Sequence, residues 1–292
     1  MGNARQIVKR RKAVTNIRKI TKTMQLIATA RFQQAFNRAT ATKPYTEMIS
    51  KLVGELAAAA GGELDHPLMR ENPEAEKTAL LVITSNRGLC GGYNSRVLST
   101  ALNFLKTTDA PATEMTVVGK KGINYFKFLR RPVEKAITSI DDKPRFDQVE
   151  PIAAEYMRRY TAGELRGVYV AYMRFISTGK QVPEVTRLLP LSKVESATPV
   201  KAGPTTNVEY DFSPEPAKLL ESLLPQTVKV RLYQAFTDAA VSEQVARMVA
   251  MKSATDAAGD MIKQLTRDFN RARQSQITLE LLDIVGGAEV LK

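Results

Sequence analysis

The sequence has one cysteine, one histidine and no tryptophan among its 292 residues. Because Cys90 has no second cysteine, the chain forms no internal disulfide and no cysteine-based metal site. The single histidine, His66, argues against histidine catalysis and against a histidine-rich metal site. The absence of tryptophan, with few aromatic residues between the basic runs, weakens the case for a surface that stacks on nucleic-acid bases.

Long apolar runs are also missing. No run approaches the roughly 20 apolar residues that cross a bilayer, and the basic start, residues 1–12, has no apolar signal core. An amphipathic, arginine-rich start is also found in mitochondrial transit peptides. Here it continues unbroken into a helical pattern, which favours an intact N-terminus of the bacterial, cytoplasmic type.

Acidic residues are outnumbered, 30 against 43 basic ones, which gives a formal net charge of +13. Such a balance indicates a polyanionic neighbour, which is a nucleic acid, an anionic membrane or an acidic protein surface. The alternative is a basic face that contacts only water.

The last third of the chain is nearly free of helix breakers. No proline follows Pro225, and Gly259 is the only glycine between it and Gly286. Apolar or small residues recur there at steps of three and four, which predicts a coiled-coil seam rather than a broad globular face. They are Ile262, Leu265, Phe269 and Ala272, and earlier Ala246, Val249 and Ser253. Residues 217–285 are therefore expected to form one helix on the order of 100 Å long.

Residues 3–56 show the same spacing and predict a second long helix. Its expected seam is Ile17, Ile20, Met24 and Ile27, with Pro44 kinking or loosening the helix and the glycines at 61–62 ending it. The basic surface suits a membrane-surface helix or a nucleic-acid arm. Because bulky aromatic anchors are missing, the pattern favours a coiled-coil strand with a solvated outside.

Between the helices the period changes. Short apolar runs near 78–84, 115–118, 133–137 and 167–175 predict strands, with helices expected at 96–106, 122–129 and 149–160. Residues 181–189 are expected to pair with the last of these strands as a hairpin. The predicted fold class is α/β, with a small, mostly parallel, Rossmann-like domain inserted between two terminal helices that pair antiparallel into a rod. The expected parts are a coiled-coil helix (1–60), a connector (61–77), the α/β domain (78–190), an irregular linker (191–216) and a second coiled-coil helix (217–292).

The glycine-rich segment 85–94 follows a strand and precedes a helix, where α/β domains place phosphate loops. It matches neither G-x-G-x-x-G nor the P-loop pattern. A tight crossover is therefore favoured over a nucleotide site, and a small buried Cys90 over a nucleophile. The carboxylate pairs Asp141–Asp142, Asp256–Asp260 and Glu280–Asp283 are interpreted as surface charge, since no third group completes a site. No catalytic, cofactor-binding or metal-binding residues are predicted.

Residues 277–285 are apolar on several sides of the helix and lie beyond the reach of the shorter N-terminal helix. Such a tip implies a sleeve made by other chains, or an aggregation hazard.

The sequence resembles the gamma subunit of the rotary F-type ATP synthase over essentially its full length. The resemblance rests on residues 17–28 (IRKITKTMQLIA), 85–92 (SNRGLCGG), 242–252 (SEQVARMVAMK), 270–280 (NRARQSQITLE) and 284–288 (IVGGA). It implies a non-catalytic shaft, without cofactors, that turns inside a hexamer of alpha and beta subunits. In this family the α/β domain sits beside the membrane ring of c subunits and binds the epsilon subunit. The implied location is the cytoplasmic side of the inner membrane, with neither nucleic acid nor a small-molecule substrate as partner.

The resemblance also implies roles for single residues. Arg273 and Gln274 match the pair that engages a beta loop, and Arg87 matches an arginine that faces the beta lever. Met24, Arg247, Thr278 and Glu280 match positions of rotor coupling, although plain helix packing explains Met24 and Thr278 equally well. Ile277, Leu281, Ile284 and Val285 fit the bearing at the top of the hexamer. The sequence departs from the family at Asn86, where aspartate is usual, and at Ala257, where asparagine is common.

Two alternatives from other classes remain. One is a basic coiled-coil protein that binds nucleic acid, and the other is a nucleotide-binding α/β enzyme.

Overall fold

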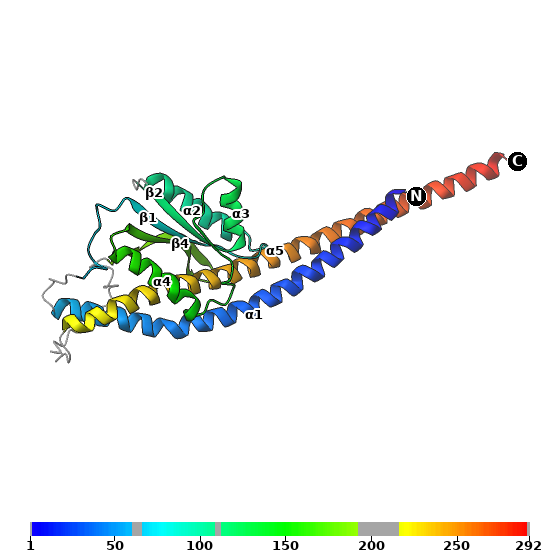
Figure 1. Cartoon of the computed structure of the whole chain (residues 1–292). Helices are drawn as coiled ribbons and strands as arrows, with labels where there is room; N and C mark the ends of the chain where they lie inside the picture. Colours follow the sequence, from blue (N-terminus) through cyan, green and yellow to red (C-terminus); the bar gives the residue numbers. More distant parts are fainter. Residues whose placement is uncertain (1, 60–65, 109–111, 192–215, 291–292) are drawn as a thin grey trace. The chain divides into compact units, whose positions relative to one another are not determined.

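The computed structural model describes residues 2–59, 66–108, 112–191 and 216–290 (Figure 1). The elements in chain order are α1 (Gly2–Ala59), β1 (Lys77–Ile83), α2 (Tyr93–Thr107), β2 (Ala112–Val118), α3 (Lys120–Phe128), β3 (Lys135–Ile137), α4 (Phe146–Thr161), β4 (Leu165–Ser177), β5 (Lys180–Leu189) and α5 (Pro216–Val290). The predicted helix end at residues 61–62 and most of the predicted linker, residues 192–215, lie outside the described ranges. The five-part division of the chain stays a prediction.

The chain divides into two compact units. The first comprises residues 1–30 and 247–292, and the second comprises residues 31–246. The two long helices, of 58 and 75 residues, each contribute to both units. Neither helix ends at its internal proline, Pro44 in α1 or Pro225 in α5.

The first unit is an antiparallel pair of helices. The hydroxyl of Thr255 lies 2.8 Å from that of Thr21. Further along, the guanidinium carbon of Arg11 lies 5.5 Å from the centre of the Phe269 ring. Since residue numbers fall along α1 as they rise along α5, the two helices run in opposite directions.

The residues that face the partner helix differ from part of the predicted seam. Val14 on α1 forms a buried cluster with Ala258 and Leu265 on α5, and Ile7 and Ile262 pack against it. Ala28 on α1 is also buried. The predicted seam residues Ile17, Ile20 and Ile27 are instead 52%, 60% and 49% exposed. On α5, Ile262 and Leu265 were predicted correctly, whereas Val249 and Ser253 are exposed.

The helical period was predicted correctly, but its phase on α1 was wrong. The inward positions Ile7, Val14, Thr21 and Ala28 recur every seven residues and become smaller toward the middle of the chain's first helix. Small side chains let two backbones approach closely, and the bulkier isoleucines one turn away then remain outside. Hydrophobicity alone favoured the isoleucines.

The second unit contains a five-stranded sheet in the order β3-β2-β1-β4-β5. Strands β1 to β4 are parallel, and β5 returns antiparallel to β4 as the predicted hairpin. Central strand β1 is buried on both faces from its second residue onward, which explains its uninterrupted apolar sequence. The predicted fold class, a mostly parallel α/β domain between paired terminal helices, is confirmed.

Helices cover both faces of the sheet. One apolar cluster joins α2 and α3 to one face and includes Leu80, Val97, Val117 and Phe126. The other cluster joins α4 and parts of α1 and α5 to the opposite face, and it includes Leu81, Tyr160, Val53 and Val228. The sheet is therefore the middle of three layers, and α5 forms part of the domain's own core.

Candidate functional site

The carboxyl ends of β1 and β2 are locked together by Thr84 and Gly119. The Thr84 hydroxyl donates to the Val118 carbonyl at 2.7 Å and accepts from the Gly122 amide at 3.0 Å. Gly119 has φ +94°, and a Cβ at that position would lie 2.2 Å from the Thr84 carbonyl oxygen. Only glycine fits there, because this backbone region and this close approach both exclude a side chain.

The glycine-rich segment 85–94 is a closed turn. Its ends are tied by Asn94, whose Oδ1 accepts from the Ser85 amide at 3.0 Å and whose Nδ2 donates to the Ser85 hydroxyl at 2.8 Å. Cys90 is 2% exposed and accepts a hydrogen bond from Asn94 Nδ2 at 3.2 Å. These contacts fit the predicted tight crossover, with Cys90 as a small buried residue.

Leu89 lies at the tip of this turn. It is 61% exposed and has φ +63°, a conformation that a leucine adopts only when its surroundings impose it. The turn thus presents an apolar side chain to its surroundings at the expense of local strain.

Asn86 and Arg87 contact the loop between β3 and α4. Asn86 Nδ2 donates to the carbonyls of Ile140 and Thr138, at 3.1 and 3.3 Å, and its Oδ1 accepts from the Lys120 amide at 3.1 Å. An aspartate has no donor for these two carbonyls, so the departure from the family pattern at position 86 has a structural use here. Arg87 forms a 3.3 Å ion pair with Asp141, and both side chains are exposed, which leaves Arg87 accessible to a partner.

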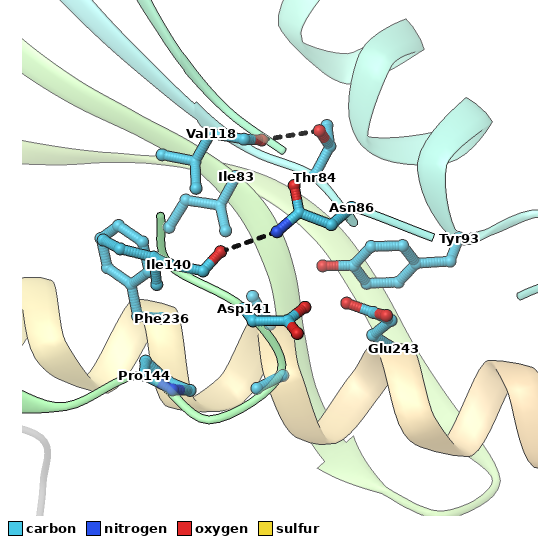
Figure 2. A pocket seen from close by; sticks show the side chains of 12 residues that line it. Ile83, Thr84, Asn86, Tyr93, Val118, Ile140, Asp141, Pro144, Phe236 and Glu243 are labelled. Carbon is cyan, nitrogen blue, oxygen red and sulfur yellow. Dashed lines mark hydrogen bonds between the residues drawn. The ribbon is translucent and has the colours of Figure 1, made fainter. Parts of the chain in front are cut away.

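The crevice at the carboxyl ends of the strands is where α/β sheets usually bind ligands. In this chain it is filled by α5, which contributes Phe236, Ala239, Ala240 and Glu243 (Figure 2). The space that remains, toward which Tyr93, Asp141 and Glu243 point, is about 20 Å³, enough for roughly one water molecule. This geometry favours the crossover interpretation over a nucleotide site.

The predicted partner residues at the C-terminal end of α5 are all on its surface. Arg273, Gln274, Thr278 and Glu280 are exposed. The Thr278 hydroxyl donates to the Gln274 carbonyl at 3.0 Å, and Glu280 accepts from Gln276 Nε2 at 3.0 Å. Both are contacts within one helix. The carboxylates of Asp256 and Asp260 are also exposed, as predicted, and Asp260 pairs with Lys263.

The other two predicted coupling residues are partly or fully covered. Met24 is half-buried on α1, and Arg247 is 8% exposed on α5. Burial of an arginine requires compensating polar contacts, so Arg247 is more constrained than a surface charge.

The apolar tip is exposed. Its bearing residues Ile277, Leu281, Ile284 and Val285 have exposures of 53%, 59%, 73% and 53%. Leu279 and Leu282 add to the same surface, at 61% and 58%. Ile17, Ile20 and Ile27 on α1 are exposed as well. The helical pair therefore exposes more apolar side chains than is usual for a monomeric soluble protein.

Two half-buried carboxylates were not predicted as sites. Asp142 is tied to Arg31 on α1, and its side chain is only 12% exposed. Asp238 on α5 accepts from Gln234 Nε2 at 2.8 Å, and burial raises the pKa of its carboxyl to about 6. No local motif marks either residue, because their neighbours come from distant parts of the sequence.

In the described ranges, no three histidine, cysteine or acidic side chains are placed to share a metal ion. Within the same residues, no helix offers a stretch both long and apolar enough to span a bilayer.

The sequence is similar to known proteins over its whole length. The family described as ATP synthase matches residues 3–291. The ATP synthase gamma chain of Rhodopirellula baltica is 48% identical over 296 residues, which cover 100% of both chains. The ATP synthase gamma chains of Dehalococcoides mccartyi (strain CBDB1) and Leptospira biflexa are 40% and 39% identical, again over 100% of both chains.

Solved structures share the fold at low sequence identity. A chain in the cryo-EM structure of the Euglena gracilis mitochondrial ATP synthase, described as OSCP/F1/c-ring, has a TM-score of 0.68 and 18% identity. The match covers 99% of this chain and 95% of that one. A chain from the central stalk and c-ring of the Tetrahymena thermophila enzyme has a TM-score of 0.60 and 21% identity, covering 80% of this chain and 99% of its own length.

Proposed function

The chain belongs to the ATP synthase gamma-chain family, and on that premise we propose that it is the central rotor shaft of a proton-translocating F-type ATP synthase. In this role, rotation of a membrane ring turns the chain, and its asymmetric surface changes the nucleotide affinity of three beta-subunit sites in turn. The chain itself is a non-catalytic subunit. The comparisons give no support to the alternative of a nucleic-acid-binding coiled-coil protein.

The observation that carries the proposal is the uncovered apolar surface of the helical pair. Six apolar side chains between residues 277 and 285 are each more than half exposed. At about 25 cal/mol per Å² of apolar surface, leaving such a tip in water is costly, so another chain is expected to surround it. A close-fitting sleeve of alpha and beta subunits meets this need and still permits turning, because apolar contacts are not directional.

Charge supports the same partners. With 43 basic against 30 acidic residues, the chain suits an acidic partner surface, which we propose is the lever of beta. Arg87 and Arg273 are exposed and lie at positions that match contacts with beta. We assign Arg87, Arg273 and Gln274 to the beta contact, and Met24, Arg247, Thr278 and Glu280 to rotor coupling.

The structural relatives support an F1 assembly and a c ring as further partners. The similar chains of known structure are parts of assemblies described as F1/c-ring and central stalk/c-ring. We propose that this chain likewise joins an alpha–beta hexamer to a c ring, and that its α/β domain binds an epsilon subunit. It then lies on the cytoplasmic side of the inner membrane as a peripheral protein.

Purification and reconstitution test the proposal. An affinity-tagged chain recovered from gently solubilised membranes is expected to bring alpha, beta, epsilon and c subunits with it. In vesicles the recovered complex should couple ATP hydrolysis to proton uptake, whereas the isolated chain should hydrolyse no ATP. Recovery without beta subunits, combined with salt-dependent retention on DNA, would instead favour the nucleic-acid alternative.

A further inference from the structure

The loop between β3 and α4 carries two adjacent aspartates that contact arginines on different elements. Asp141 pairs with Arg87, and the two side chains are 47% and 59% exposed. Asp142 pairs with Arg31 of α1, and these side chains are 12% and 35% exposed. The second pair is far better shielded from water, so its charges attract each other more strongly.

Asp142 also reaches the other long helix. Gln244 of α5 is fully buried, and its Nε2 lies 3.5 Å from the same carboxylate oxygen that binds Arg31. One carboxylate therefore joins the loop, α1 and α5. Arg31 is the first residue of the second unit on α1, and Gln244 lies two residues before this unit ends on α5.

The loop is itself fixed to the sheet. Asn86, which follows β1, donates from one amide group to the carbonyls of Thr138 and Ile140. On the far side of Asp142, the ring of Phe146 packs edge-on against Tyr233 of α5, with centroids 5.6 Å apart. A continuous set of polar contacts thus runs from the sheet through Asn86 to the loop, and from Asp142 to both helices.

We propose that this loop is a coupling junction, and that Asp142 is a positioning residue that makes α1 and α5 turn together with the α/β domain. The inference rests on the proposed function, because only a rotor loads this contact. Near Asp142, α1 otherwise meets the domain through apolar contacts, such as those of Phe32 and Phe36 with Phe175. Apolar attraction is not directional, whereas a charge-assisted hydrogen bond is directional and fixes the positions of both groups.

The test uses the assembled complex in proton-tight vesicles. Asp142→Ala removes the junction, and Asp142→Asn keeps its shape while removing the charge. The exchange variant, Arg31→Asp with Asp142→Arg, restores an ion pair of reversed polarity. Asp147→Asn is the matched control, because Asp147 pairs with the nearby Arg145 but both are exposed and no helix is bridged. For each variant, the yield of assembled complex, the rate of ATP hydrolysis and the rate of proton uptake are measured.

The proton uptake per ATP hydrolysed is expected to fall at least about two-fold in Asp142→Ala, while hydrolysis continues. The exchange variant should recover part of the ratio, and Asp147→Asn should match the unchanged complex. A merely structural role would lower the yield of complex without changing this ratio.

An unchanged ratio in a fully assembled Asp142→Ala complex overturns the junction. If Asp142→Ala does not assemble, the ratio measured for Asp142→Asn decides the question. The proposed junction is also overturned if neither variant assembles, or if Asp147→Asn lowers the ratio equally. A complex with the unaltered chain that pumps no protons would instead refute the proposed function.

Discussion

Replacing Leu265 by alanine should weaken the helical pair, whereas the same replacement at Leu279 should not. Leu265 is 8% exposed and packs in a cluster with Val14 and Ala258, with Ile7 and Ile262 alongside. Leu279 lies four turns further along the same helix and is 61% exposed. Since both changes convert leucine to alanine in one helix, their small effects on helix propensity cancel.

The expected magnitude follows from burial. Truncation of a buried leucine to alanine costs about 2 to 5 kcal/mol, and the cost is lower where the neighbours close the cavity. The cluster around Leu265 is small and lies between only two helices, so about 2 to 3 kcal/mol is expected for Leu265→Ala. For Leu279→Ala the free chain should change by no more than about 0.5 kcal/mol.

Native-state hydrogen exchange of the free chain measures this difference where it arises. A loss of about 2 to 3 kcal/mol corresponds to exchange about 30- to 150-fold faster for amides at positions 258–270. Amides of the sheet should keep their rates and provide the internal control. Equal effects of the two variants, or a change of less than about three-fold in Leu265→Ala, would show that this seam does not hold the helices together.

Three further outcomes are expected. Gly119→Ala should destabilise the chain by about 2 to 5 kcal/mol in a denaturant titration, because it adds a backbone collision to a left-handed φ. Gly163→Ala is the control, because φ there is +76° but a Cβ at that position would have no atom within 4 Å. Its expected loss of stability is therefore only about 1 to 2 kcal/mol. Equal losses in the two variants would contradict the proposed collision at Gly119. Asp238→Asn should remove a pH dependence: burial raises the pKa of Asp238 to about 6, so the folded chain holds a proton that the unfolded chain loses near pH 4. The contribution of Asp238 to stability should therefore fall by about 2 to 3 kcal/mol between pH 4 and pH 6, and Asp238→Asn should be the more stable form at pH 7. Equal slopes in the two titrations would refute this. Arg273→Glu should impair ATP synthesis by inverted vesicles but change the unfolding free energy of the free chain by less than about 0.5 kcal/mol, and a double-mutant cycle with acidic beta residues that shows no coupling would count against the beta contact.

Most of the fold could be predicted from the sequence because its signals are local. The uninterrupted run in β1, the hairpin of β4 and β5, and the breaker-free last third each follow from a few neighbouring residues. Element limits differed by a few residues; α2, for example, begins at Tyr93 rather than residue 96. Fraying and capping at element ends depend on contacts that a periodic pattern does not contain.

The facing residues of the helical pair were harder to predict. Isoleucines at 17, 20 and 27 and the smaller residues at 14, 21 and 28 both recur at helical spacing, and hydrophobicity alone favours the isoleucines. A strict seven-residue recurrence of small residues was the available signal for close approach. The larger set faces outward and is about half exposed, because the smaller residues allow the two helices to approach closely.

The roles of Asp142 and Asn86 were inaccessible to sequence reasoning for a different reason. Asp142 and Arg31 are 111 positions apart, and no sequence feature near either residue indicates their contact. The pair Asp141–Asp142 was interpreted as surface charge, which holds for Asp141 but is wrong for Asp142. The sequence shows Asn86 only as a departure from the family, because its donor function depends on the carbonyls of residues 138 and 140, which are more than 50 positions away.

The helix that occupies the mouth of the sheet has an implication for how this architecture could be taken apart. Truncating the chain before residue 236 would expose the apolar surface that α5 now covers, so the remaining α/β domain would not be stable by itself. The α/β domain and the helical pair therefore cannot be exchanged independently. Joining this helical pair to another α/β domain would require redesigning the residues at the carboxyl ends of that domain's strands.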